Sequence, residues 1–282
     1  MIDPMASPTP LITSGANPRV RSAIGLRDRR ERDRAGLTIV DGAREVRRAL
    51  DAGVDVVEAF VCESLLAGAD ARAALDLILA RDVLRCSVSE TVFAKLAFGG
   101  RAEGLVAVVR VPSTDLADLE MGPDPLLLVI EGVEKPGNVG AVVRTADGAG
   151  VDGVIAASPT TDLYNPNAIR ASAGTIFGLA LASAPTDDVL AWLRARDIRV
   201  VTARVDADLA YTEADLIGPL AIVLGTEAGG LTSAWDGPGI TPIRIPMAGT
   251  ADSLNVSISA AILAYEARRQ RDNADQHPMA RR

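Results

Sequence analysis

The strongest constraint on the fold is an uninterrupted run of apolar residues, Leu126–Ile130, near the middle of the chain. Strands that are buried on both faces have such continuous runs, and they occur in parallel sheets that are covered by helices. Apolar runs and helical spacings alternate from there to the last expected helix, Ser257–Arg271. This alternation predicts a doubly wound parallel α/β domain. Its expected strands are residues 126–130, 153–157, 198–203, 220–224 and 243–245, and its expected helices are residues 139–150, 166–174, 187–196 and 257–271.

The first part of the chain shows a separate alternation of strands and helices. Strands are expected at residues 37–40, 56–61, 83–88 and 105–111, and helices at residues 42–52, 65–80 and 90–97. This pattern predicts an α/β sandwich over residues 19–111. Residues 112–125 contain Pro, Gly, Asp and Thr with little periodicity and are expected to link it to the second domain, residues 126–271. Residues 1–18 and 272–282 are predicted to be flexible tails.

The formal net charge of −8 argues, taken alone, against a nucleic-acid partner. Arginines nevertheless crowd the short stretch Arg19–Arg34, whereas the acidic residues are dispersed. The stretch by itself fits a solvated basic helix as well as a nucleic-acid contact. Aromatic residues make up only 3% of the chain, so base stacking on aromatic platforms is not favoured.

The chain lacks the residues that several other functional classes require. The two cysteines, Cys62 and Cys86, have no CxxC spacing and are expected to be buried thiols, and the single histidine is His277, so no metal site is predicted. No apolar stretch reaches the roughly 20 residues of a membrane span, and no secretion signal is visible. We therefore expect a cytoplasmic protein with no membrane partner.

Three glycine-rich loops follow expected strands: residues 132–140, 225–231 and 246–255. Each alone could be turn chemistry, and Asn138 or Ser253 could be only a helix N-cap. Three such loops at successive strand ends favour a ligand site instead, because ligands bind past the carboxyl ends of parallel strands. The spacings of phosphate-binding loops are absent. The chain also lacks a histidine base and a nucleophile elbow, which is compatible with methyl transfer because that reaction needs neither a covalent intermediate nor a metal.

Three segments resemble the signature motifs of the SpoU (TrmH-like) branch of the SPOUT RNA 2′-O-ribose methyltransferases. They are Glu134–Gly150, Ile222–Leu231 and Ile245–Glu266, in matching order and separation. The first domain is similar to the L30e-like substrate-binding domain of this branch, through LTIVDGAREVRRAL (residues 37–50) and KLAFGGRAEGLVAVV (residues 95–109). Asp41 stands where the branch often has Glu. The combination is similar to ribosomal RNA methyltransferases, including members that confer antibiotic resistance.

The resemblance implies a trefoil-knotted C-terminal domain, a homodimer, S-adenosyl-L-methionine as cofactor and structured RNA as substrate. The implied catalytic residues are Arg144, Asn138, Glu227 and Asn255. The implied cofactor-binding residues are Leu224, Gly225, Glu227, Ile245, Met247, Ser253, Leu254 and Asn255. Arg144, Arg170, Arg27, Arg29 and Arg30 are the expected RNA-binding residues. Because an arginine is a poor base, Arg144 is expected to bind an RNA phosphate and orient the 2′-hydroxyl.

Ribosomal RNA is the expected acceptor, and other functions stay open at this point. The chain could methylate transfer RNA, or a small molecule or protein. It could also be a non-catalytic RNA-binding or ribosome-assembly module that binds the cofactor. The basic stretch argues against a small-molecule acceptor, and the intact set of catalytic residues argues against a non-catalytic role.

Overall fold

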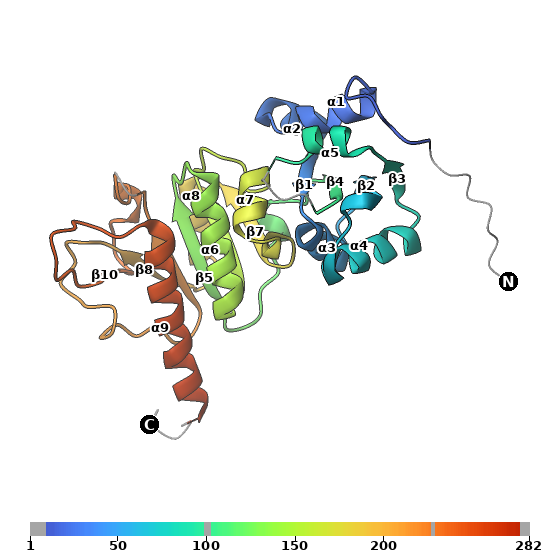
Figure 1. The fold of residues 1–282 in the computed structure, drawn as a ribbon. Coiled ribbons are helices and arrows are strands. Elements are labelled where there is room, and N and C mark those ends of the chain that lie inside the picture. The colour runs from blue at the N-terminus through green and yellow to red at the C-terminus, as the bar shows by residue number, and fades with distance from the viewer. Residues whose placement is uncertain (1–9, 99–102, 227–228, 277–282) are drawn as a thin grey trace. The chain divides into compact units, whose positions relative to one another are not determined.

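The computed structural model describes residues 10–98, 103–226 and 229–276, and the chain divides into two compact units (Figure 1). Unit 1 is formed by the residues up to Pro112 together with Tyr164–Gly178. Unit 2 is formed by Ser113–Leu163 and the residues from Leu179 onward. The boundaries drawn from sequence placed residues 164–178 in the second domain, so their position in unit 1 differs from that expectation.

Unit 1 contains a mixed four-stranded sheet. Its described elements are α1 (Pro18–Gly25), α2 (Arg29–Ala35), β1 (Leu37–Asp41), α3 (Ala43–Asp51), β2 (Val56–Val61), η1 (Glu63–Leu65), α4 (Gly68–Ala80), β3 (Leu84–Ser87), α5 (Glu90–Leu96), β4 (Leu105–Arg110), α7 (Pro166–Ala171) and η3 (Thr175–Phe177). The strand order is β1-β4-β2-β3, with β4 antiparallel to both neighbours and β3 parallel to β2. A cluster around Phe60, Phe93 and Leu96 forms the core, and Cys62 and Cys86 are buried in it, as the sequence predicted.

Side chains of unit 1 bind the backbone of the segment 164–178, and the periodicity of the sequence does not reveal these contacts. The Thr38 hydroxyl donates a 2.9 Å hydrogen bond to the carbonyl of Tyr164, and the Arg48 guanidinium donates one of 2.8 Å to the carbonyl of Ala173. Gly174 has a φ of +81°, and a Cβ there would lie 2.9 Å from the Cα of Glu45. Only glycine allows this close approach between the segment and α3.

Unit 2 contains a six-stranded sheet in which all strands are parallel, as the sequence predicted. Its described elements are η2 (Leu116–Asp118), β5 (Leu126–Glu131), α6 (Pro136–Ala149), β6 (Gly153–Ala157), β7 (Ala180–Ala184), α8 (Thr186–Arg194), β8 (Arg199–Ala203), β9 (Leu220–Leu224), η4 (Ser233–Trp235), β10 (Ile240–Ile243) and α9 (Val256–Gln276). The strand order is β10-β8-β9-β5-β6-β7. Every residue of β5 is buried, and α9 packs along α6 (Figure 1).

Two strands of unit 2 depart from the sequence-based expectation. Strand β7 was not predicted, because Ala180–Ala184 consists of alanine, leucine and serine, which signal a strand weakly. Strand β10 lies earlier than the expected residues 243–245 and includes Pro242. A proline is tolerated there because β10 is an edge strand that pairs with β8 alone.

The expected tails are shorter than predicted. Ile12 forms a parallel bridge with Val88, and α1 begins at Pro18, so residues 10–18 are part of unit 1. At the other end, α9 continues to Gln276, beyond the expected Arg271. No described helix combines enough length with enough apolar character to span a bilayer. The trefoil knot stays a prediction.

Candidate active site

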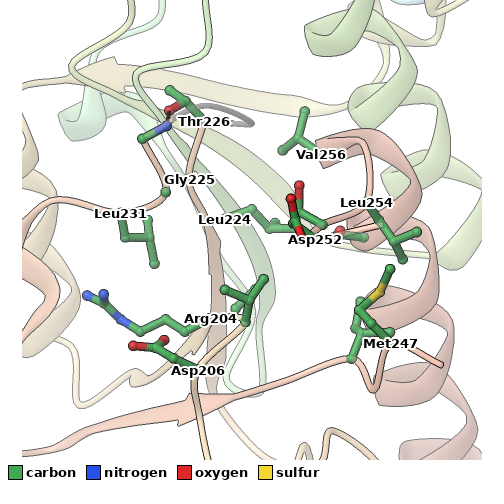
Figure 2. A pocket seen from close by; sticks show the side chains of 17 residues that line it. Arg204, Asp206, Leu224, Gly225, Thr226, Leu231, Met247, Asp252, Leu254 and Val256 are labelled. Atoms are coloured by element: carbon green, nitrogen blue, oxygen red, sulfur yellow. Dashed lines mark hydrogen bonds between the residues drawn. The ribbon is translucent and has the colours of Figure 1, made fainter. Parts of the chain in front are cut away.

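A cavity of about 490 Å³ lies at the carboxyl-terminal edge of the unit 2 sheet (Figure 2). Ligands bind past the carboxyl ends of parallel strands in such sheets. The cavity has the volume of a typical small-molecule site, and residues after β8, after β9 and before α9 line it. Six predicted cofactor residues line it: Leu224, Gly225, Ile245, Met247, Ser253 and Leu254.

The described residues of the loop after β9, 225, 226 and 229–231 (the β9 loop), fold back at Gly225. The backbones of Thr226 and Gly230 exchange two hydrogen bonds, of 3.1 and 3.0 Å. A Cβ on Gly225 would lie 2.2 Å from the carbonyl carbon of Gly230, so glycine is required by space at this position. Gly225, Gly229 and Gly230 of this loop line the cavity.

Two predicted catalytic residues, Asn138 and Asn255, meet in the structure. The Asn255 side-chain amide donates a 3.3 Å hydrogen bond to the Asn138 side-chain oxygen. The Asn255 oxygen also accepts a 3.0 Å bond from the backbone of Ser257, so Asn255 caps α9. Neither suggested N-cap occurs: Ser253 does not cap α9, and Asn138 lies inside α6, whose N-cap is Lys135.

A third predicted catalytic residue, Arg144, is not hydrogen-bonded to this pair. Arg144 is exposed on α6, has no hydrogen bond or ion pair with any described residue, and is not among the described residues that line the cavity. Glu227 lies outside the part of the chain that the structure describes. The described residues also contain no group of three or more His, Cys, Asp or Glu side chains that could hold a metal ion.

Comparison with known proteins identifies the family. Residues 125–265 match the model of the SpoU rRNA Methylase family, and residues 17–107 match an MRM3-like substrate binding domain. The chain is also 32% identical over 259 residues to the 23S rRNA (uridine(2479)-2'-O)-methyltransferase of Streptomyces viridochromogenes, with 87% of each chain covered. The chain belongs to the SpoU rRNA methylase family.

Solved structures support the same membership along nearly the whole chain. One is a crystal structure of an RNA 2'-O ribose methyltransferase, 42% identical with a TM-score of 0.81, covering 93% of this chain and 99% of the other. Another is an AdoMet-bound rRNA methyltransferase from Sinorhizobium meliloti, 29% identical with a TM-score of 0.83, covering 93% and 98%. The match of both units agrees with the two-domain SpoU organisation predicted from the motifs.

One wall of the cavity was not predicted from the sequence. Ala203, the last residue of β8, and residues 204–206 line it, and Figure 2 labels Arg204 and Asp206 in the cavity wall. Arg204 pairs with Asp236 at 2.5 Å. The available signal was position: β8 neighbours β9 in a parallel sheet, so the carboxyl ends of both strands lie at one edge. Asp252 and Ser259, which also line the cavity, were missed as well.

The basic stretch is not one uniform surface of free arginines. Arg27 donates to the carbonyls of Lys95 and Leu96 at the end of α5 and lies 5.2 Å from the ring centroid of Phe98. Burial lowers the pKa of its guanidinium, and the nearby Asp41 carboxylate opposes that shift. Arg27 therefore has a structural role that the sequence analysis did not assign.

The remaining predicted RNA-binding arginines of unit 1 differ in how they are held. Arg170 lies over the Phe98 ring at 5.8 Å and 3.9 Å from the Asp41 carboxylate. Arg29 pairs with Asp33 at 3.5 Å on α2. The Arg30 side chain is exposed and forms no hydrogen bond or ion pair with a described residue. Among Arg27, Arg29 and Arg30, the side chain of Arg30 is therefore the most available to bind a phosphate.

Proposed function

We propose that this protein transfers the methyl group of S-adenosyl-L-methionine to a ribose 2′-hydroxyl of ribosomal RNA. The observation that carries the proposal is the cavity formed by the SpoU motif loops, six of whose lining residues are predicted cofactor contacts. Relatives along most of the chain are named 23S rRNA 2'-O-methyltransferases, including that of Bacillus subtilis, 26% identical and covering 91% of this chain and 98% of the relative.

The cavity fits S-adenosyl-L-methionine in size and in chemistry. Backbone groups of Gly225 and Leu224, together with the apolar side chains of Met247 and Leu254, would hold the adenine and ribose. Aliphatic walls and exposed backbone amides suit an adenine ring, which has an apolar face and a polar edge. When bound, the cofactor supplies an electrophilic methyl group. Glu227 remains a proposed contact for cofactor and RNA.

Arg144 is assigned to the RNA substrate. Its exposed guanidinium can bind a phosphate with two parallel hydrogen bonds and so fix the adjoining ribose. Its guanidinium stays protonated at neutral pH and is therefore a poor proton acceptor, so removal of the hydroxyl proton would need help from the RNA phosphate that Arg144 binds. The Asn138–Asn255 pair joins the first turn of α6 to the start of α9 and would orient the ribose or Arg144.

We also propose a homodimer that forms on α6 and α9. Asn138 of α6 is hydrogen-bonded to Asn255 at the start of α9, and one helix length further on a Cβ added to Gly148 would lie 3.1 Å from the Tyr265 hydroxyl. The two helices therefore run side by side in the same direction. Ile258 and Tyr265, seven residues apart on one face of α9, are 51% and 54% exposed. A dimer would cover this face and bring Arg144 toward a partner's cavity. Sedimentation at a mass of one 29.3 kDa chain across micromolar concentrations would contradict it.

Replacing Arg30 by alanine is expected to weaken RNA binding about threefold to tenfold and to flatten its salt dependence, because one phosphate contact is lost. Thermal stability should stay unchanged, since the Arg30 side chain holds no described partner. Replacing Arg27 instead should lower the melting temperature, because it removes hydrogen bonds to Lys95 and Leu96. Filter binding at several salt concentrations and thermal denaturation check both. Equal RNA affinity in wild type and the Arg30 variant would remove Arg30 from the interface.

The function is tested with radiolabelled S-adenosyl-L-methionine and four acceptors: ribosomal subunits, free ribosomal RNA, transfer RNA and a protein extract. We expect label in ribosomal RNA, resistant to alkaline hydrolysis at one position because a 2′-O-methyl group blocks cleavage there. Label confined to transfer RNA or protein would favour the corresponding alternative, and cofactor binding without transfer to any acceptor would favour a non-catalytic module. We also predict a cytoplasmic location, because ribosomal RNA is the expected acceptor.

A further inference from the structure

Glu131, the last residue of β5, is a buried carboxylate beneath the β9 loop. Its exposed fraction is 4%. In the parallel register Ile130 is opposite Leu224, so Glu131 is level with Gly225, where the loop begins. A buried carboxylate is unfavourable unless hydrogen bonds replace its hydration. The residues that donate hydrogen bonds to Glu131 therefore indicate its role.

Three neutral donors satisfy the Glu131 carboxylate. Its Oε2 accepts a 2.8 Å bond from the backbone N–H of Thr232, and its Oε1 accepts a 2.8 Å bond from the Thr232 hydroxyl. Oε1 also accepts a 2.9 Å bond from the hydroxyl of Thr186, the first residue of α8. Thr186 is bound in turn to the Ser158 side chain, which follows β6. One carboxylate thus links the ends of β5 and β6 and the start of α8 to Thr232.

Thr232 directly follows the last residue of the β9 loop, Leu231. The loop leaves the sheet after Leu224 and folds back at Gly225, and it returns to the core at Leu231, which is 9% exposed. Arg204 holds the carbonyl of Thr232 from the other side, at 3.5 Å. The return point of the loop is therefore held through its N–H, hydroxyl and carbonyl.

The β9 loop supplies one wall of the cavity, through Gly225, Thr226, Gly229, Gly230 and Leu231. Glu131 itself is not among the described lining residues. A group that holds a loop in its binding conformation raises affinity by reducing the ordering that binding must supply. Glu131 can thus act on a ligand that it does not touch.

We propose that Glu131 is a positioning residue that preorganises the β9 loop for S-adenosyl-L-methionine. This inference rests on the proposed function, because it names a determinant of the same cofactor site. Glu131→Ala leaves the Thr232 N–H and hydroxyl without their acceptors. We expect the Kd for the cofactor to rise about tenfold or more. Glu131→Gln keeps the length and an oxygen for the Thr232 N–H, and its NH₂ can donate to hydroxyls that rotate, so its Kd should stay within about threefold of wild type.

The experiment is calorimetric titration of the full-length variants with S-adenosyl-L-methionine, accompanied by thermal denaturation and RNA filter binding. Asp152→Asn is the matched control, because the Asp152 carboxylate accepts a 2.7 Å bond from the backbone of Leu126 at the opposite end of β5. We expect Glu131→Ala to weaken cofactor binding while RNA affinity stays unchanged, and Asp152→Asn to leave cofactor binding within twofold of wild type.

Should Glu131→Ala fail to fold, Thr232→Val and Thr202→Val provide a second pair. Thr232→Val removes one hydroxyl donor to Glu131 and should raise the cofactor Kd about threefold. Thr202 is buried on β8 and its hydroxyl has no partner in the described structure, so Thr202→Val should leave the Kd unchanged. The same Kd in Thr232→Val as in Thr202→Val would overturn the proposal.

Three further results would overturn the positioning role: a Glu131→Ala protein that binds cofactor within threefold of wild type, an equal loss in Asp152→Asn, or a loss in Glu131→Gln as large as in Glu131→Ala. Failure of the proposed function looks different, because the wild-type protein itself would then bind no S-adenosyl-L-methionine or would methylate no RNA. Cofactor titration and a methylation assay of the wild-type protein separate the two failures.

Discussion

Replacing Arg144 by alanine is expected to reduce methyl transfer to RNA by about a hundredfold to a thousandfold, while the Kd for S-adenosyl-L-methionine stays unchanged. The expected loss follows from the removal of one group that orients the reacting hydroxyl, because a misplaced nucleophile or a missing charged donor has effects of this size. Cofactor binding should survive because Arg144 is not among the described residues that line the cavity. Single-turnover methylation and calorimetric titration measure the two quantities.

Arg194→Ala is the matched control for Arg144→Ala. Arg194 is also an exposed arginine on a helix of unit 2, α8, and forms no hydrogen bond or ion pair with a described residue. Its loss should leave both transfer and cofactor binding within about twofold of wild type. Arg144→Lys separates charge from geometry: because lysine lacks the planar fork, we expect it to recover only a small part of the rate. Wild-type turnover in Arg144→Ala would refute the assigned role.

The sequence predicted those parts of the fold that depend on local patterns. The apolar run of β5 indicated a strand buried on both faces, and the structure buries all of its residues. Strand β7 was missed because its residue types signal a strand weakly, and its pairing with β6 is not visible in a local pattern. The placement of Tyr164–Gly178 in unit 1 was missed because it depends on contacts with Thr38, Glu45 and Arg48, far away in sequence.

The candidate site shows the same division between local and long-range information. Glycine-rich motifs indicated Gly225 and the loop before α9, because their conformations are set locally. Glu131 was missed because one acidic residue at a strand end carries no signal until Thr186 and Thr232 are known to meet it. Arg27 was assigned to RNA from charge alone, although its guanidinium is bound to carbonyls of α5. A count of charges cannot distinguish a free guanidinium from one that is already bound.

The second large effect is expected at Gly225, where one added methyl group meets backbone rather than a side chain that can move. A Cβ at this position would lie 2.2 Å from the carbonyl carbon and oxygen of Gly230. The Gly225→Ala protein must therefore separate Thr226 from Gly230, whose two backbone hydrogen bonds hold the fold-back. Overpacking of a fixed contact has effects of about 1–3 kcal/mol, so we expect the Kd for S-adenosyl-L-methionine to rise about fivefold to a hundredfold.

Gly237→Ala makes the same chemical change in open space, since a Cβ there meets nothing within 4 Å. It should bind cofactor as wild type does, and most of the RNA affinity should be retained in both variants because the predicted RNA-binding residues Arg29, Arg30 and Arg170 lie in unit 1. Circular dichroism and RNA filter binding verify that each variant is folded, and calorimetry gives the Kd. If Gly225→Ala bound S-adenosyl-L-methionine as tightly as Gly237→Ala, the β9 loop would not form the wall of the cofactor site, and the cavity at the edge of this sheet would have to be assigned to a different ligand.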